Sequence, residues 1–208
     1  RAPWMAYAIA EAKQFKGLDE KEIEKSRNYA TEVKTGQSTI IGNDHPWCAA
    51  FVNWCLMQAG YPIENPDFYD HTAAKGRAHG FYEVKGKKEN KTDKDAAMVR
   101  NPLYVEIEKP IFGAIAMVTN AGGHGHHVGF VYAKSENGLD AILLGGNQKN
   151  QINFSPFSID RKSFKKIKMD NGKKIEVTKW TESLKFFIPA PYSKQAILDE
   201  KLNDLGVA

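Results

Sequence analysis

The sequence predicts an α+β fold in which helices come first and a meander of strands follows. In the first 60 residues, apolar side chains recur at helical spacing and glycines stand where helices end. From Pro110 onward, short β-rich runs alternate with turns that contain Gly and Asn. Because the strands follow the helices instead of alternating with them, a doubly wound parallel sheet is not expected.

The composition is that of a single globular domain spanning residues 1–208. Hydrophobic residues make up 42% of the chain and charged residues 26%, which argues against disorder. No apolar run approaches the roughly 18 residues of a membrane helix, so membrane insertion is not expected. The formal net charge of +4 is modest. It is compatible with an anionic substrate, although solvated lysines explain such a balance equally well.

Three helices are expected in the N-terminal part, with a polar loop over residues 35–43. The first covers residues 3–16, and Trp4, Ala8, Ile9 and Phe15 form its packing side. The second is expected over residues 20–34 and should be more charged and more exposed.

The third expected helix covers residues 44–60. Asp44 is placed to cap it, and Gly60 is suited to the left-handed residue that ends a helix. Cys48 then lies in the first turn, where backbone amides and the helix dipole favour a thiolate. Cys55 belongs to the apolar stripe, and its separation of roughly 10 Å along the axis excludes a disulfide with Cys48.

The second half has weaker signals. Residues 61–110 show little pattern beyond a short helix at 72–76, and residues 85–94 read as a charged surface loop. Strands are expected at residues 111–118, 127–133, 141–144, 151–154 and 185–189. An Asn-Gly turn predicts a hairpin over 167–177, and a last helix is expected over 193–205.

A catalytic arrangement is conceivable around Cys48. His127 opens a strand, and Asn147 stands twenty residues later at the end of the next one. If those strands are antiparallel neighbours, Asn147 returns to the level of His127 and can orient its ring, which is the logic of a Cys-His-Asn site.

Other interpretations of the same residues remain open. A lone helical cysteine is most often structural. The cluster of His124, His126 and His127 is compatible with a metal site, although no second ligand set supports it. The segment 145–147 is more often a turn than a catalytic element. The lysine-rich hairpin is most simply a solvated face, and nucleic-acid binding is not expected.

Four motifs in register resemble one family. They are Pro3-Trp4-Met5-Ala6, Pro46-Trp47-Cys48-Ala49-Ala50-Phe51-Val52-Asn53-Trp54-Cys55, Gly125-His126-His127-Val128-Gly129-Phe130 and Leu144-Gly145-Gly146-Asn147-Gln148. In this order they resemble the NlpC/P60 and CHAP group of papain-like peptidoglycan hydrolases, over residues 3–189. The resemblance implies a papain-like α+β fold in which a buried helix carries the cysteine and packs on an antiparallel sheet.

The resemblance also implies roles for single residues. The family's nucleophile corresponds to Cys48, its base to His127 and its third, orienting residue to Asn147, with Gln148 as a weaker match that shapes the pocket. Two departures stand out. Family members usually carry Gly-Asp-Ile where this chain has Gly113-Ala114-Ile115, and segments 61–110 and 158–182 are enlarged.

The function implied is a cysteine hydrolase that cuts an amide bond of bacterial peptidoglycan, either within the stem peptide or at its junction to the glycan. The Cys48 amide is the expected oxyanion donor, with Asp44 or His45 as possible contributors. No cofactor and no metal are expected. Such a protein is a phage lysin or a type VI secretion effector delivered to a rival's periplasm, the latter with a cognate immunity protein. A monomer is expected. The alternative is a catalytically inactive wall- or partner-binding module on the same fold.

Overall fold

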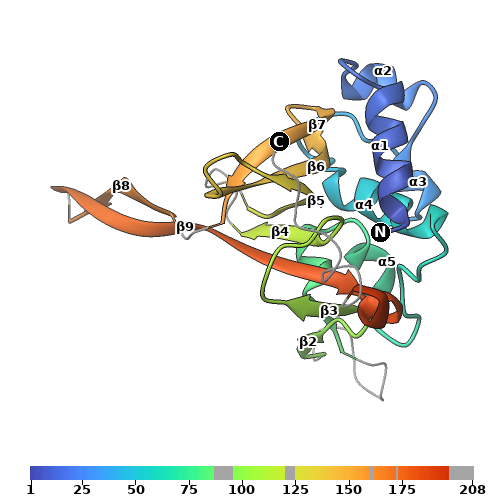
Figure 1. The fold of residues 1–208 in the computed structure, drawn as a ribbon. Helices are drawn as coiled ribbons and strands as arrows, with labels where there is room; N and C mark the ends of the chain where they lie inside the picture. The colour runs from blue at the N-terminus through green and yellow to red at the C-terminus, as the bar shows by residue number, and fades with distance from the viewer. Residues whose placement is uncertain (87–95, 120–124, 160–161, 172, 197–208) are drawn as a thin grey trace.

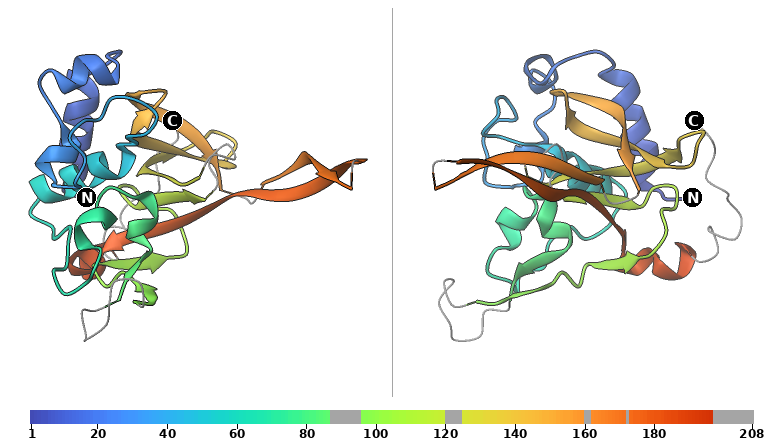
Figure 2. Two further views of the ribbon diagram at one scale, coloured as in Figure 1. Left: turned by 180° about the vertical axis from the view of Figure 1, so that it is seen from behind. Right: turned by 90° about the vertical axis from the view of Figure 1, so that its left-hand side faces the viewer.

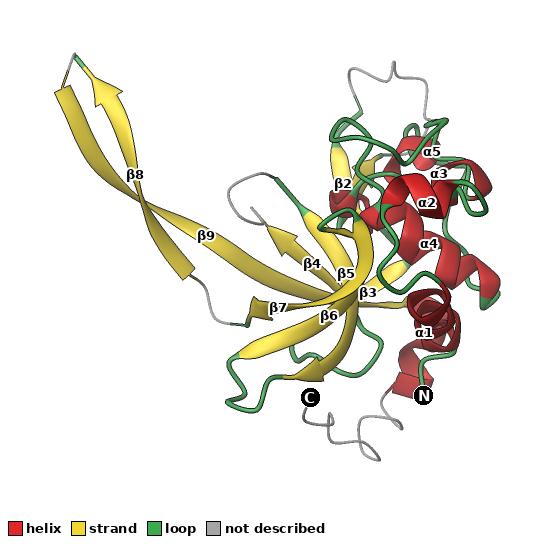
Figure 3. Cartoon of the chain, turned by 90° about the horizontal axis from the view of Figure 1, so that it is seen from above, coloured by secondary structure: helices red, strands yellow, loops and turns green. Residues whose placement is uncertain are grey.

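The structure is a computed structural model that describes residues 1–86, 96–119, 125–159, 162–171 and 173–196. Helices gather on one side of an antiparallel sheet, as Figures 1 and 3 show. The sheet has seven strands in the order β3-β9-β4-β5-β6-β7, with β8 paired to β9 off this path. The predicted α+β class with a helix-covered antiparallel sheet is confirmed.

The central helix α4 (Cys48–Gln58) packs against β5 and β6. It begins at Cys48, so the prediction that Asp44 caps it is wrong. Proline disfavours helical backbone at the residue before it, and Pro46 therefore keeps His45 out of the helix. The first helical bond is donated by Phe51 N–H to the carbonyl of Trp47 at 2.9 Å.

The C-terminal end of α4 is as predicted. Gly60 has a φ of +79°, which a residue with a side chain rarely adopts. The amide of Gly60 donates to the carbonyl of Met57 at 3.0 Å, and that of Tyr61 to the carbonyl of Leu56 at 3.0 Å. These two bonds form a Schellman motif, which satisfies the last carbonyls of the helix.

Helix α1 (Trp4–Gln14) confirms the first predicted helix, but the second is broken in two. Its parts are α2 (Glu20–Glu24) and α3 (Tyr29–Glu32). The side chain of Asn28 accepts from the amide of Thr31 at 3.1 Å and starts a new helix there. Tyr29 is fully buried, so this stretch is also less exposed than the charge pattern suggested.

The sheet's middle strands are β4 (Ile115–Thr119), β5 (His127–Lys134), β6 (Asp140–Gln148) and β7 (Gln151–Ser158). Residues 145–147 are part of β6, so their interpretation as a turn is wrong. The turn to β7 is made by Lys149 and Asn150 instead, with φ of +57° and +60°. Two successive left-handed residues are typical of a type I′ hairpin turn.

Strand β4 starts later than predicted because residues 111–114 form a turn. Gly113 has a φ of +81°, and a Cβ there would come within 2.3 Å of the Ala2 side chain. Its carbonyl accepts the Trp4 indole N–H at 2.7 Å, which docks α1 onto the sheet.

The predicted hairpin and the predicted last strand share one long strand. β8 (Lys162–Asp170) pairs with the first part of β9 (Lys173–Pro189), and the last part of β9 lies between β3 and β4. The hairpin extends away from the body of the molecule, as Figure 1 and the left view of Figure 2 show.

Segment 61–110 contains several short elements, of which only the short helix was predicted. They are α5 (His71–Ala74), η1 (Ala78–Phe81), β1 (Glu83–Lys85), β2 (Met98–Arg100) and β3 (Tyr104–Ile107). Most of the predicted charged loop lies outside the described residues. After η4 (Ala190–Tyr192), residues 193–196 are helical. The rest of the predicted last helix lies outside the described residues. Within the described part of the chain, no helix has the length and apolar character needed to cross a membrane.

Candidate active site

Cys48 is the first residue of α4, and its thiol lies against the start of β5. The side chain is 4% exposed. The backbone N–H of Val128, the residue after His127, is directed at the sulfur, as are the amides of Ala49 and Cys48 itself. Burial raises the pKa of the Cys48 thiol, and these three amides only partly offset it. The predicted thiolate is therefore not the resting form, because burial outweighs the helix start.

His127 is the first residue of β5 and immediately precedes Val128, whose amide is directed at the Cys48 thiol. Its ring stacks on Phe157 of β7, with centroids 5.5 Å apart and an interplanar angle of 20°. The Nε2 atom is buried and has no hydrogen-bond partner among the residues that the structure describes. Burial lowers the pKa of His127 to about 4, so the ring is neutral near pH 7 and able to accept a proton.

Asn147 is brought to the level of His127 by the pairing of β5 with β6. Phe130 pairs with Leu144, and the same register continued by three residues places Asn147 opposite His127. Both line one hollow of about 280 Å³, together with Gln148, Lys149, Ser155 and Phe157. The predicted convergence of His127 and Asn147 is thus present in the structure. Asn147 has a φ of +56°, a conformation that Asn adopts more readily than most residues.

Glycines let the strand of Asn147 press against the helix of Cys48. A Cβ on Gly146 would lie 2.5 Å from the Trp47 ring and 2.8 Å from the Cβ of Phe51. A Cβ on Gly145 would lie 2.7 Å from the side-chain nitrogen of Gln148. Sequence reasoning missed this role, although two adjacent glycines inside a strand are a signal of close backbone approach.

Gln148 is buried and braces the irregular end of β6. Its Nε2 donates to the carbonyls of Leu143 at 3.1 Å and Asn153 at 2.9 Å, across the point where the β6–β7 register shifts. These bonds support the prediction that Gln148 shapes the pocket.

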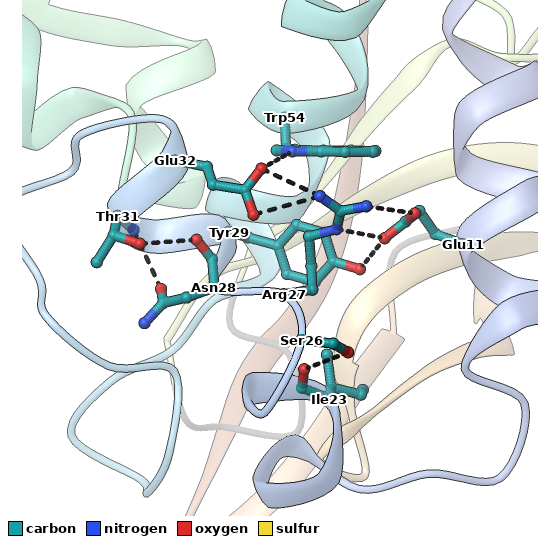
Figure 4. Close-up of polar contacts among 9 residues, drawn as sticks. All are labelled: Glu11, Ile23, Ser26, Arg27, Asn28, Tyr29, Thr31, Glu32 and Trp54. Carbon is teal, nitrogen blue, oxygen red and sulfur yellow. Dashed lines mark hydrogen bonds and ion pairs between the residues drawn. The ribbon is translucent and has the colours of Figure 1, made fainter.

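A polar cluster of Glu11, Arg27, Tyr29 and Glu32 was not predicted (Figure 4). Tyr29 stacks on Trp47 with centroids 5.6 Å apart at 9°, and its hydroxyl donates to Glu11 at 2.5 Å. Arg27 bridges Glu11 and Glu32, each at 3.2 Å. The cluster thereby links α1 and α3 to the residue that precedes Cys48.

Replacing Arg27 with alanine is expected to lower the free energy of unfolding by about 3 kcal/mol, because it leaves the buried Glu11 carboxylate without its cation. Urea denaturation measures this. The exposed Lys21→Ala serves as control and should change stability by less than about 0.5 kcal/mol. Equal stability of both variants would show that the cluster does not hold the fold together.

Asn53 has a structural task within the cysteine motif. Its side-chain amide donates to the carbonyl of Lys75 at 2.9 Å, and its oxygen accepts from the Tyr104 hydroxyl at 3.2 Å. It therefore connects α4 with α5 and β3. Cys55 is fully buried, and burial raises the pKa of its thiol well above the usual range, as expected of a packing residue.

The remaining predicted participants are arranged differently from expectation. The backbone amide of His45 donates to the carbonyl of Gly42 at 3.0 Å, so that amide is already engaged. His126 contacts His79, with ring centroids 5.2 Å apart, and does not share the stacking partner of His127. His124 lies outside the described residues. Among those described, no group of three or more His, Cys, Asp or Glu is placed to hold a metal ion.

Comparison with known families identifies one match. The model of the CHAP domain matches residues 40–147, which is more than half of the chain. The matched segment contains Cys48 and His127 and ends at Asn147. Neither a curated protein nor a solved structure matches the chain. The matched segment, the α+β architecture and the resemblance of the four motifs agree, and the chain belongs to the CHAP domain family.

Proposed function

We propose that the protein is a cysteine hydrolase that cuts an amide bond of bacterial peptidoglycan. CHAP domains are generally peptidoglycan hydrolases, and membership of the family supports the substrate class. The observation that best supports the mechanism is that the neutral His127, whose Nε2 has no partner among the described residues, lines one hollow with Asn147, while the amide of the next residue, Val128, is directed at the thiol of Cys48.

The first step follows from the protonation states. Both Cys48 and His127 are neutral near pH 7, so attack and proton transfer occur together. The sulfur forms a bond to the substrate carbonyl carbon while the thiol proton passes to the imidazole. The amide of Cys48 has no acceptor within the helix and is directed at the sulfur before the reaction; it is the donor proposed for the oxyanion that develops beside that sulfur.

The second half returns the enzyme to its starting state. The imidazolium of His127 gives its proton to the leaving amine, the carbon–nitrogen bond breaks and an acyl-enzyme remains on Cys48. Water, deprotonated by His127, then attacks the acyl carbon, the carbon–sulfur bond breaks to release the carboxylic acid, and the proton on His127 returns to the Cys48 sulfur. Asn147 is the residue proposed to hold the His127 ring in the productive orientation, as the third member of such a triad does.

The biological setting belongs to the same proposal. A lysin or a secreted effector acts on the cell wall from the periplasm or from outside, and an effector is accompanied by an immunity protein. A wall-binding module without activity would need neither a cysteine at the start of α4 nor a neutral histidine that shares a hollow with Asn147, so these residues favour the enzyme.

Digestion of purified sacculi tests the reaction class. Soluble products are expected to carry one new amine and one new carboxyl group each, and their masses identify the bond. Products cut only in the glycan strand, or no products at all, would overturn the proposal.

A further inference from the structure

The feature with no role so far is the β8–β9 ribbon, residues 162–182, which we call the arm. It projects from the body in Figure 1, in the left view of Figure 2 and in Figure 3. Among the described strands, β8 pairs only with β9. The family match ends at Asn147, so the arm lies outside it.

The arm carries the positive charge of the chain. It contains three acidic residues, Asp170, Glu176 and Glu182, against seven lysines: Lys162, Lys165, Lys166, Lys168, Lys173, Lys174 and Lys179. Its formal net charge of +4 equals that of the whole protein, so the remaining residues balance to zero. Charges of either sign would keep a projecting ribbon soluble. An excess of positive charge, by contrast, attracts an anionic partner.

The arm leaves the sheet at the level of the candidate active site. Val118 of β4 pairs with His127 on one side and with Leu184 of β9 on the other. The arm therefore begins two residues before a position that is level with His127 and two strands away, roughly 10 Å at ordinary strand spacing. A polymer that enters the site is long enough to reach the arm as well.

We propose that the arm binds the anionic peptidoglycan polymer and holds it across the active site, an inference that rests on the proposed function. The stem peptides carry carboxylates at regular intervals, and these complement a basic ribbon of several residues' length. Contacts between exposed charges are screened by salt, so the arm adds affinity for the polymer without selecting the scissile bond. A short soluble fragment bound at Cys48 does not extend to the arm.

Binding is tested on full-length protein with the Cys48→Ala change, so that the polymer stays intact. One variant replaces Lys165, Lys168, Lys173 and Lys174 with glutamine. A matched control, called the helical control, replaces four exposed lysines that lie in or next to α1 and α2, namely Lys13, Lys16, Lys21 and Lys25, in the same way. Co-sedimentation with purified sacculi at physiological salt is expected to fall at least fivefold for the arm variant and to stay near wild type for the control. Circular dichroism and thermal unfolding establish that both variants fold.

Activity separates this proposal from the one on which it rests. With Cys48 present, the arm variant is expected to cut a soluble muropeptide at the wild-type rate and to show a raised KM on sacculi. Wild-type protein that cuts neither substrate would refute the proposed function. Equal sacculus binding and KM for the arm variant and the helical control would overturn the role of the arm.

Discussion

Cys48→Ala is expected to reduce peptidoglycan hydrolysis by at least a thousandfold, because it removes the proposed nucleophile that forms the acyl-enzyme. The initial rate of clearing of a sacculus suspension measures the loss. The thiol is small and buried, so removing its sulfur should cost only about 1 kcal/mol of stability, as chemical denaturation will show.

Cys55→Ala is the matched control for this change, since it removes the other buried thiol of the same helix. It is expected to keep most of the activity, because Cys55 belongs to the packed core. Loss of hydrolysis in a folded Cys55→Ala protein, with activity retained in Cys48→Ala, would show that Cys55 and not Cys48 is the nucleophile.

His127→Gln is expected to lower kcat by a factor of about 10² to 10⁴, the range that a general base contributes. The glutamine side chain is similar in size but does not accept a proton at neutral pH. Steady-state kinetics on a soluble fragment should show the effect mainly in kcat. A variant with unchanged kcat would remove His127 from the mechanism.

The pH dependence follows from the depressed pKa of His127. The ring is neutral above its pKa of about 4, so the His127-dependent part of kcat/KM is expected to persist through mildly acidic pH and to fall below about 4. An ordinary histidine would cause the loss near pH 6.5, which would contradict the buried, neutral ring.

The pH dependence of stability also follows from the lowered pKa of His127. Between about pH 6.5 and 4, the unfolded chain binds a proton at His127 and the folded chain does not, so the free energy of unfolding falls as the pH falls. The contribution amounts to about 3 kcal/mol across that window, as an order of magnitude. It is obtained as the difference between wild type and His127→Gln in urea denaturation at each pH.

The positions of the candidate site residues on α4, β5 and β6 were largely predictable from the sequence, because these elements have clear local signals. Gly60 ends α4 through a left-handed backbone that few other residues adopt. The spacing between His127 and Asn147 fits a hairpin, which returns the chain to the same level. These are short-range patterns, and they correctly predicted that the strands of His127 and Asn147 are neighbours.

What the sequence did not reveal depends on contacts between distant segments. The break at Asn28 follows from a side-chain cap and from burial of Tyr29 against Trp47, neither of which a charge pattern shows. The thiol of Cys48 is neutral because the whole helix is enclosed, a property of packing and not of helix position. Likewise, the second strand of the arm and the last strand of the sheet are one continuous strand, β9, whereas the apolar pattern suggested two separate strands.

The most direct test of the Cys48 mechanism is rapid acid quenching of the protein with a soluble muropeptide, followed by intact-protein mass spectrometry and peptide mapping. The account predicts an acyl adduct on the peptide that contains Cys48, and neither adduct nor turnover for Cys48→Ala. An adduct on any other residue, or repeated turnover by Cys48→Ala, would contradict it.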